Sequence, residues 1–86
     1  MIKYSIYISG TTVNGLLDTF KQCKLDVSMF PMHGTWQGKL EYGTLIVHLG
    51  DGSTAPLIKA LACDLKASFE QARVVVTSER INMEII

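Results

Sequence analysis

The 86-residue chain has few of the residues with which small domains usually reinforce themselves. It contains two cysteines and two histidines, so neither a disulfide framework nor a zinc site with three or four convergent ligands is indicated. Cys23 and Cys63 fall within apolar patterns and are predicted to be small buried hydrophobes. Such use of cysteine is typical of a reducing compartment. We therefore expect no metal and no cofactor.

An excess of charge of one sign is also missing. Eight basic and eight acidic side chains cancel, whereas proteins that bind nucleic acid normally carry a basic excess or stripe. No run approaches the roughly 20 apolar residues of a membrane span. The first ten residues, MIKYSIYISG, alternate instead of forming the apolar segment of a signal peptide. The composition predicts a cytoplasmic protein that binds neither nucleic acid nor membrane.

The chain is instead rich in apolar residues. Its length predicts a single domain over residues 1–86, and a domain of this size buries only about 60–65% of the surface that its unfolded chain exposes. Hydrophobic residues make up 48% of the chain and charged residues 19%. Small domains improve their stability through disulfides, metals or self-association. The apolar surplus favours self-association.

In the first half, apolar and polar residues alternate strictly from Ile2 to Ser9, which predicts a half-buried strand. The sequence SGTT then ends this strand, and Thr11 or Thr12 can cap a following helix. A second strand begins near Leu25. Pro31 lacks a backbone donor and so places this strand at a sheet edge or kinks it. The apolar face of the helix is predicted to be Val13, Leu16, Leu17 and Phe20.

In the second half, YGTLIVHLG (42–50) reads as a third strand, with Leu45, Val47 and Leu49 on one face. Ser53 or Thr54 caps a second helix, with Pro56 tolerated in its first turn. ARVVVTSE (72–79) is a β-branched fourth strand, and INMEII (81–86) either continues it or pairs as a fifth. The apolar stripe of the second helix is predicted to be Ile58, Leu61, Ala62, Leu65 and Phe69.

The resulting order of elements is β-α-β-β-α-β. Two helices and four strands in this order predict an α+β, ferredoxin-like βαββαβ fold, with an antiparallel four-stranded sheet and two helices on one face. The right-handed rule for crossover connections favours this arrangement over most others.

Such a sheet leaves one face without helices, and this face is predicted to be mixed rather than polar. Its apolar members are expected to include Ile46, on the opposite face from Leu45, and one side of Val74–Val76. A partner that covers part of the face is the economical explanation, and a monomer with an apolar sheet is the alternative. The residues expected at an interface are Trp36, Tyr42, Ile46, Met83 and Ile85.

The stretch MFPMHGTWQGKLEYGT contains the only tryptophan. Trp36, Gly38, Lys39 and Glu41 resemble the W-x-G-K-x-E segment between the second and third strands of the CutA family, whose members are ferredoxin-like trimers grouped with the PII signalling proteins. The resemblance implies a trimer in which this hairpin reaches over the neighbouring subunit. It also implies clefts between subunits for small anionic or nucleotide ligands. The chain lacks that family's Cys-bearing N-terminal region, so no metal binding is carried over.

Trp36 is expected either to anchor an interface between subunits or to stack on a ligand. Lys39 and Glu41 share a strand face and are expected to pair in solvent. SGTTVNG, Ser9 to Gly15, leads a strand through a glycine into a helix N-terminus rich in hydroxyls, which favours an anion; ordinary capping is the alternative. The candidate ligand-binding residues are Ser9, Gly10, Thr11, Thr12, Trp36, Lys39, Arg73 and Arg80.

Signs of enzymatic chemistry are weak. His33 and His48 have no ligand-type spacing to a cysteine or a carboxylate, and no nucleophile elbow is present. We expect a non-enzymatic, small oligomeric binding or regulatory protein that binds or sequesters a small anionic ligand, such as a nucleotide, between subunits. The alternative is a small inhibitor or interaction protein, of the kind that mobile elements encode, that blocks a host protein through its sheet face or its Trp36 hairpin.

Overall fold

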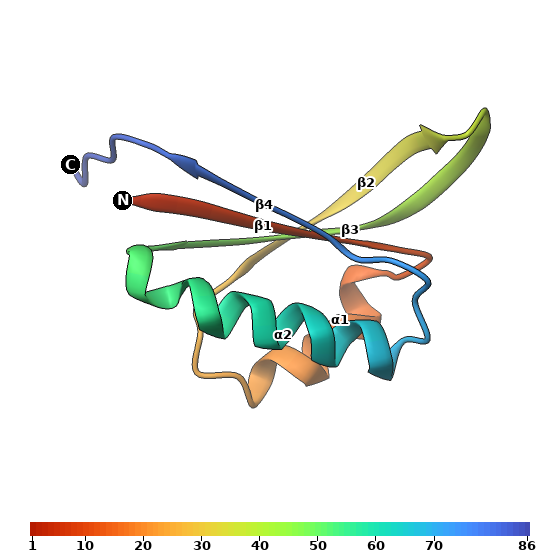
Figure 1. Ribbon diagram of the computed structural model, residues 1–86, viewed down its shortest axis with the longest axis horizontal. Coiled ribbons are helices and arrows are strands. Elements are labelled where there is room, and N and C mark those ends of the chain that lie inside the picture. The colour runs from red at the N-terminus through yellow and green to blue at the C-terminus, as the bar shows by residue number, and fades with distance from the viewer.

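The computed structural model describes all residues from 1 to 86, and the order of elements is the predicted βαββαβ (Figure 1). The fold is α+β and ferredoxin-like, as the sequence predicted. A 3₁₀ turn, Gly52–Thr54, precedes the second helix. The elements are β1 (Ile2–Ser9), α1 (Val13–Lys21), β2 (Ser28–Trp36), β3 (Lys39–Gly50), α2 (Ala55–Ser68) and β4 (Val75–Arg80).

The four strands form one antiparallel sheet in the order β2-β3-β1-β4. Both helices lie on the same side of it (Figure 1). β2 is an edge strand, which confirms the prediction made from Pro31, although it begins at Ser28 and not near Leu25. Residues 81–86 form no fifth strand; the Ile81 N–H donates to the Met1 carbonyl at 3.1 Å and the chain continues past the sheet.

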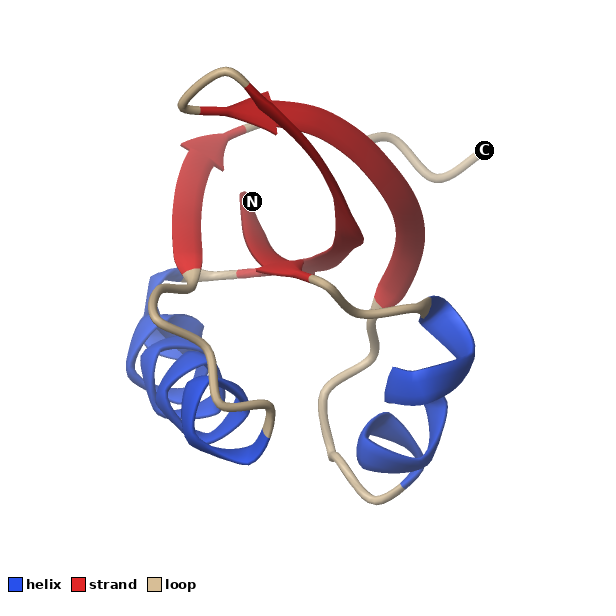
Figure 2. Cartoon of the chain, turned by 90° about the vertical axis from the view of Figure 1, so that its right-hand side faces the viewer, coloured by secondary structure: helices blue, strands red, loops and turns tan.

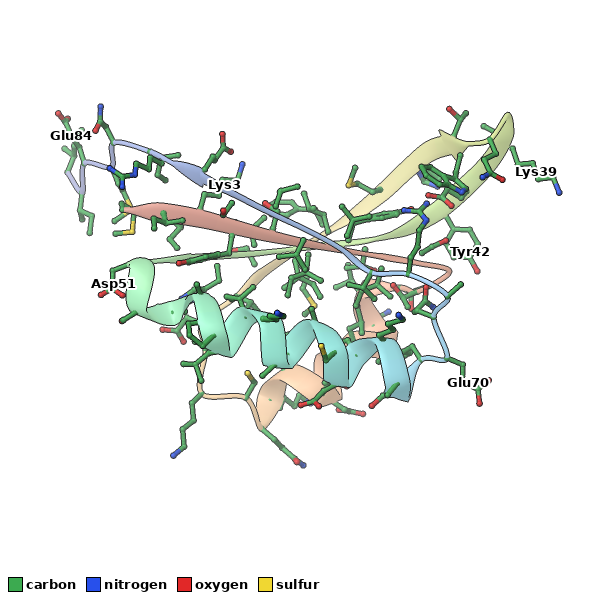
Figure 3. All side chains as sticks on the ribbon, in the orientation of Figure 1. Lys3, Lys39, Tyr42, Asp51, Glu70 and Glu84 are labelled. Atoms are coloured by element: carbon green, nitrogen blue, oxygen red, sulfur yellow. The ribbon has the colours of Figure 1, made fainter.

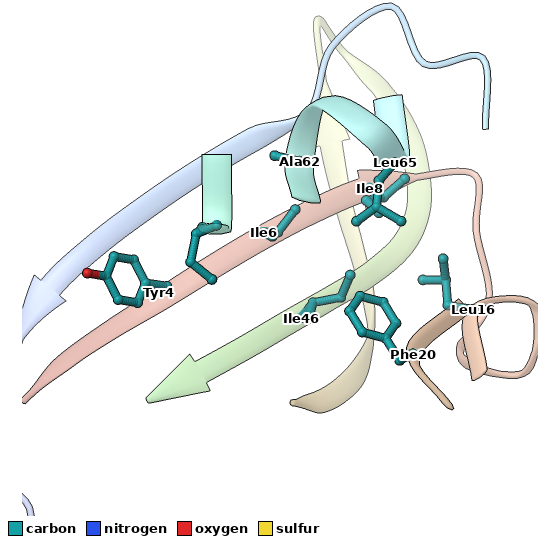
Figure 4. Packing of buried hydrophobic residues seen from close by; sticks show 9 residues of the cluster. Tyr4, Ile6, Ile8, Leu16, Phe20, Ile46, Ala62 and Leu65 are labelled. Atoms are coloured by element: carbon teal, nitrogen blue, oxygen red, sulfur yellow. The ribbon is translucent and has the colours of Figure 1, made fainter. Parts of the chain in front are cut away.

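The core lies between the sheet and the two helices (Figure 4). The alternating apolar residues of β1 point toward the helices, as predicted. Each helix packs a short apolar stripe against them. Burying one large aliphatic side chain contributes about 1.5–3 kcal/mol, so this cluster supplies most of the stability. Its members are Tyr4, Ile6, Ile8, Leu16, Phe20, Ile46, Ile58, Ala62 and Leu65.

The predicted orientation of β3 is wrong. Ile46, expected on the open face and at an interface, is 1% exposed and lies in the core. Apolar residues occur on both faces of β3, so hydrophobicity alone does not set the phase of the alternation. The register does: Ile46 lies opposite Ile6, and residues directly opposite in a sheet project to the same face. Leu45 and Val47 therefore face away from the helices.

Local hydrogen bonds explain how α1 and α2 begin. Of the two candidate caps for α1, Thr12 is the cap, because its hydroxyl accepts from the Gly15 N–H at 3.0 Å. At α2, Thr54 makes no side-chain cap. Instead Asp51 caps the 3₁₀ turn that precedes α2, where it accepts from the Ser53 N–H at 2.9 Å, and the hydrogen bonds from Ser53 lower the pKa of the Asp51 carboxyl. Cys63, predicted to be buried, is exposed on α2.

The sheet face without helices, called here the open face, is apolar mainly on β2 and β3, whereas β1 places Lys3, Ser5 and Ser9 on it. Viewed from the hairpin end, the sheet curves so that β4 rises on one side of this face and the β2–β3 hairpin arches over the other (Figure 2). The open face is therefore concave. The strand registers place on it the large apolar residues Phe30, Met32, Trp36, Leu45, Val47, Leu49 and Val75.

Candidate functional site

The twist of the sheet brings its two edges together at one end. Trp36 ends β2, and Arg73 lies just before β4, on the opposite edge. The Arg73 guanidinium carbon nevertheless lies 3.7 Å from the centroid of the Trp36 ring. This contact is possible because the hairpin arches over the open face (Figure 2). A guanidinium over an indole is a favourable cation–π pair, worth about 0.5–1 kcal/mol where it is exposed.

Polar groups from β1 and β3 complete what we call the Trp36 cluster, which consists of Tyr7, Ser9, Trp36, Glu41 and Arg73. Glu41 Oε1 lies 3.6 Å from Arg73 Nη2. The Ser9 hydroxyl donates to Glu41 Oε2 at 3.3 Å. The carboxylate therefore balances the guanidinium, and within one chain Arg73 has no free charge to offer an anion.

Tyr7 is the member of the cluster with an altered acidity. Burial of the phenol, followed by the Glu41 charge and a hydrogen bond to Glu41, raises the pKa of Tyr7 above its ordinary value of 10.0. Ser9 and Arg73 oppose the rise. A raised folded-state pKa means that the folded state holds the proton more tightly than the unfolded state. The resulting stabilisation is complete below pH 10 and is lost as pH rises through the pKa of folded Tyr7.

The Glu41→Gln substitution tests this environment. It removes the carboxylate, and the pKa of Tyr7 should fall toward its ordinary value while remaining raised, because burial of the phenol persists. The measurement is an NMR titration of the Tyr7 ring carbon, with the Glu79→Gln variant as control, since that exposed carboxylate pairs with Lys3. An unchanged titration in Glu41→Gln would show that the two side chains do not meet.

The candidate ligand residues lie in four separate places. The cluster brings together Ser9, Trp36 and Arg73. Lys39 lies opposite Trp36 at the tip of the hairpin and points into solvent (Figure 3). Arg80 lies at the far end of β4, opposite Ile2.

Gly10, Thr11 and Thr12 line the turn that leads from β1 into α1. Gly10 has a φ of 70° and donates its N–H to the Tyr42 carbonyl at 2.7 Å. The Thr11 hydroxyl is turned into the fold, where it donates to the Ile8 carbonyl at 2.8 Å and lies 3.2 Å from the hydroxyl of Thr44. Thr12 caps the helix. These three residues therefore have local structural roles, and none belongs to the Trp36 cluster.

The residues expected at an interface are dispersed. Trp36 is 49% exposed, and Tyr42 is also exposed on β3 (Figure 3). Met83 and Ile85 are exposed beyond β4, at the opposite end of the sheet. Ile46 is buried, and the other four predicted interface residues lie at opposite ends of the sheet. The five residues therefore do not form one patch.

Two features of the site were mispredicted or missed. Glu41 pairs with Arg73 and not with Lys39, which forms no ion pair. Tyr7 was not singled out as a site residue, although its place two residues before Ser9 on the polar phase of β1 puts both on the open face. That spacing was the available signal.

Both histidines lie outside the Trp36 cluster. His48 Nδ1 lies 2.8 Å from the Asp26 carbonyl oxygen, and its ring stacks on Tyr4 with 6.3 Å between centroids. His33 is exposed on edge strand β2. No group of three His, Cys, Asp or Glu side chains is placed to hold a metal ion. None of the helices is both long and apolar enough to cross a bilayer.

Comparison of the chain with protein-family models, with curated proteins and with solved structures finds no match. Of the resemblance to CutA, the structure bears out the βαββαβ order and the four-stranded antiparallel sheet.

Proposed function

We propose that the protein is a non-enzymatic binding protein that assembles with copies of itself through the open face. The observation that carries this proposal is the apolar character of that face on the neighbouring strands β2 and β3. Phe30, on edge strand β2, is 50% exposed, and Met32 on β2 and Leu49 on β3 are also exposed. Val75 is exposed on β4, on the other side of β1. A solvated antiparallel sheet face is normally polar at alternate positions. Contiguous apolar patches of this kind mark protein interaction sites.

An ion pair lies at each end of the open face, which supports an interface. Lys3 and Glu79 pair at 3.6 Å at one end of the open face. Arg73 and Glu41 pair at the other end. An apolar centre with a polar rim is the usual anatomy of a specific interface. Ion pairs at the rim set orientation and contribute little affinity.

Copies of the same chain are the favoured partner because the chain as a whole is apolar for its size, with a mean hydropathy of +0.24. The W-x-G-K-x-E resemblance around Trp36 supports a trimer as the form of the assembly. In such a trimer, the arched hairpin of each subunit lies against its neighbour. The interface covers apolar area that one subunit leaves in water.

A small anionic ligand, such as a nucleotide, is proposed for the clefts between subunits. The half-exposed ring of Trp36 offers a stacking surface. Glu41 already balances Arg73, so further positive charge is required. Lys39 and Arg80 lie at opposite ends of one subunit and reach a common cleft only when they come from different copies. Occupancy of the clefts then regulates the assembly or sequesters the ligand.

A second candidate function is inhibition of another protein. It is favoured by the β2–β3 hairpin, which projects from the body of the fold (Figure 1). Leu40 at its tip is 88% exposed, close to the half-exposed Trp36. Tryptophan and arginine are enriched among residues that dominate binding energy. The exposed tip and the Trp36–Arg73 pair would then insert into a site on the other protein.

The Trp36→Ala substitution tests both candidates. If the ring is an anchor, the substitution should weaken self-assembly, or the affinity for ATP as an anionic probe, by about 2 kcal/mol or more. Native mass spectrometry and calorimetric titration measure the two quantities, and Trp36→Phe is the matched control that keeps an aromatic ring. If the substitution changed the free energies of self-assembly and of ATP binding by less than about 0.5 kcal/mol each, Trp36 would be an exposed residue with no part in binding. A wild-type monomer that captures one other macromolecule would favour the inhibitor.

A further inference from the structure

A groove runs between α2 and β4, on the helix side of the sheet. Its volume is about 430 Å³, within the roughly 300–1,000 Å³ typical of small-molecule sites. It is a separate feature from the open face and from the Trp36 cluster, since none of the cluster residues lines it. The apolar side chains along it include Tyr4, Ile58, Ala62, Val74 and Val76.

The groove exists because β4 is an edge strand. Nothing pairs beyond β4, and α2 presents alanines at positions 55 and 62 toward it. Val76 points to the helix side of the sheet and is still 43% exposed. The residues after Arg80 continue away from α2 (Figure 1), and none of them lines the groove.

The two ends of the groove differ in polarity. The Tyr4 hydroxyl donates to the Asp51 carbonyl at 2.7 Å, just before α2 begins, and Tyr4 lies opposite Ser78 in the sheet. Ser78 and Lys59 therefore lie toward the same end, near the start of α2. Since β4 runs antiparallel to α2, Val74 and Lys66 lie toward the other end.

The charge of the groove has one sign. Lys59 and Lys66 are its only charged residues, and neither takes part in an ion pair. They lie two helical turns apart, about 10 Å along α2. Asp64, the only acidic residue of α2, lies on the far side of the helix at 3.6 residues per turn. An occupant therefore meets an apolar floor with positive charge along its rim.

We propose that this groove binds a carboxylate that bears a linear apolar chain. The carboxylate pairs with the Lys59 ammonium and accepts from the Ser78 hydroxyl at the polar end. The chain lies along Val76 and Ala62 toward Val74, where the methylene stem of Lys66 packs over it. Apolar burial supplies most of the affinity, and the lysine selects the charge.

Decanoate, below the concentration at which it forms micelles, is the probe for a titration of the ¹⁵N-labelled full-length chain by NMR. We expect saturable amide shifts confined to the residues that line the groove and their neighbours in α2, β4 and β1 at Tyr4. Lys59→Glu should weaken binding at least about tenfold, and Lys66→Glu should weaken it less, because Lys66 acts mainly through its stem. Ala62→Leu fills the floor and should abolish binding. Lys59→Glu changes an exposed side chain, so it tests the proposal even where Ala62→Leu perturbs packing.

Matched controls decide between this occupant and others. Lys21→Glu, on α1 and outside the groove, should bind decanoate as the wild type does. Decanol should bind at least about tenfold more weakly than decanoate. Equal affinity for decanol, shifts confined to the open face, or no saturable shift would each overturn the proposal. Binding to phosphatidylglycerol vesicles without binding of free decanoate would also overturn it, in favour of a membrane surface.

Discussion

Gly43→Ala is expected to cost at least about 3 kcal/mol of unfolding free energy, close to the limit that a domain of this size tolerates. A Cβ atom at this position in β3 would collide with the Ile8 carbonyl oxygen and would lie 2.9 Å from Ser9 Cα. Both are backbone atoms of β1, the neighbouring strand, so they move only if the β1–β3 ladder opens. The phenol oxygen of Tyr7 would lie at 2.9 Å as well. Urea unfolding followed by circular dichroism measures the loss.

Gly34→Ala is the matched control for this prediction. Gly34 lies in the same hairpin, but a Cβ there would meet no atom within 4 Å. Its unfolding free energy should stay within about 0.5 kcal/mol of the wild type. If Gly43→Ala unfolded at the wild-type urea concentration, the close approach of β3 to β1 at Ser9 would be contradicted, and with it the register that turns Ile46 into the core.

Phe30→Asp is expected to dissociate the proposed assembly. Phe30 is on the open face, opposite Leu45, so a carboxylate there would have to be buried without a partner when a second copy covers the face. We expect self-association to weaken by at least about 3 kcal/mol, more than a hundredfold. The fold should survive, because the side chain is already half exposed in the single chain. Analytical ultracentrifugation of the variant measures the change.

Leu57→Asp provides the control for Phe30→Asp. Leu57 is an exposed leucine on α2, away from the open face, so its substitution introduces the same charge at a similar cost in hydrophobicity. The Leu57→Asp variant should assemble as the wild type does. If both variants assembled normally, the open face would not be the interface. If both dissociated, net charge rather than the face would control association.

The parts of the fold that followed from sequence are those with a single strong periodicity. Strict alternation over Ile2–Ser9 identified β1 and its buried face, and the helical stripe from Ile58 to Leu65 identified the inner face of α2. The order of elements then limited the topology to very few choices. Pro31 correctly placed β2 at an edge, because an edge strand tolerates the missing donor.

The orientation of β3 and the arrangement of the Trp36 cluster could not be predicted from the sequence, for physical reasons. Apolar residues lie on both faces of β3, so only its register with β1 decides that Ile46 is buried. The contact between Trp36 and Arg73 depends on the cumulative twist of four strands, which no local pattern encodes. Glu41 has cations available in Lys39 and Arg73, and the curvature of the sheet selects Arg73. The sequence therefore identified most of the residues of the cluster, but it did not predict which of them contact each other.

Sedimentation equilibrium of the wild-type chain at micromolar concentration tests most directly whether copies of the chain cover the open face. We expect a mass that is a multiple of the 9.5 kDa chain, with about three times that mass for the trimer. The mass should return to that of one chain in Phe30→Asp but not in Leu57→Asp. A wild-type protein that sediments only as single chains would contradict self-assembly, and the proposed clefts between subunits would not exist.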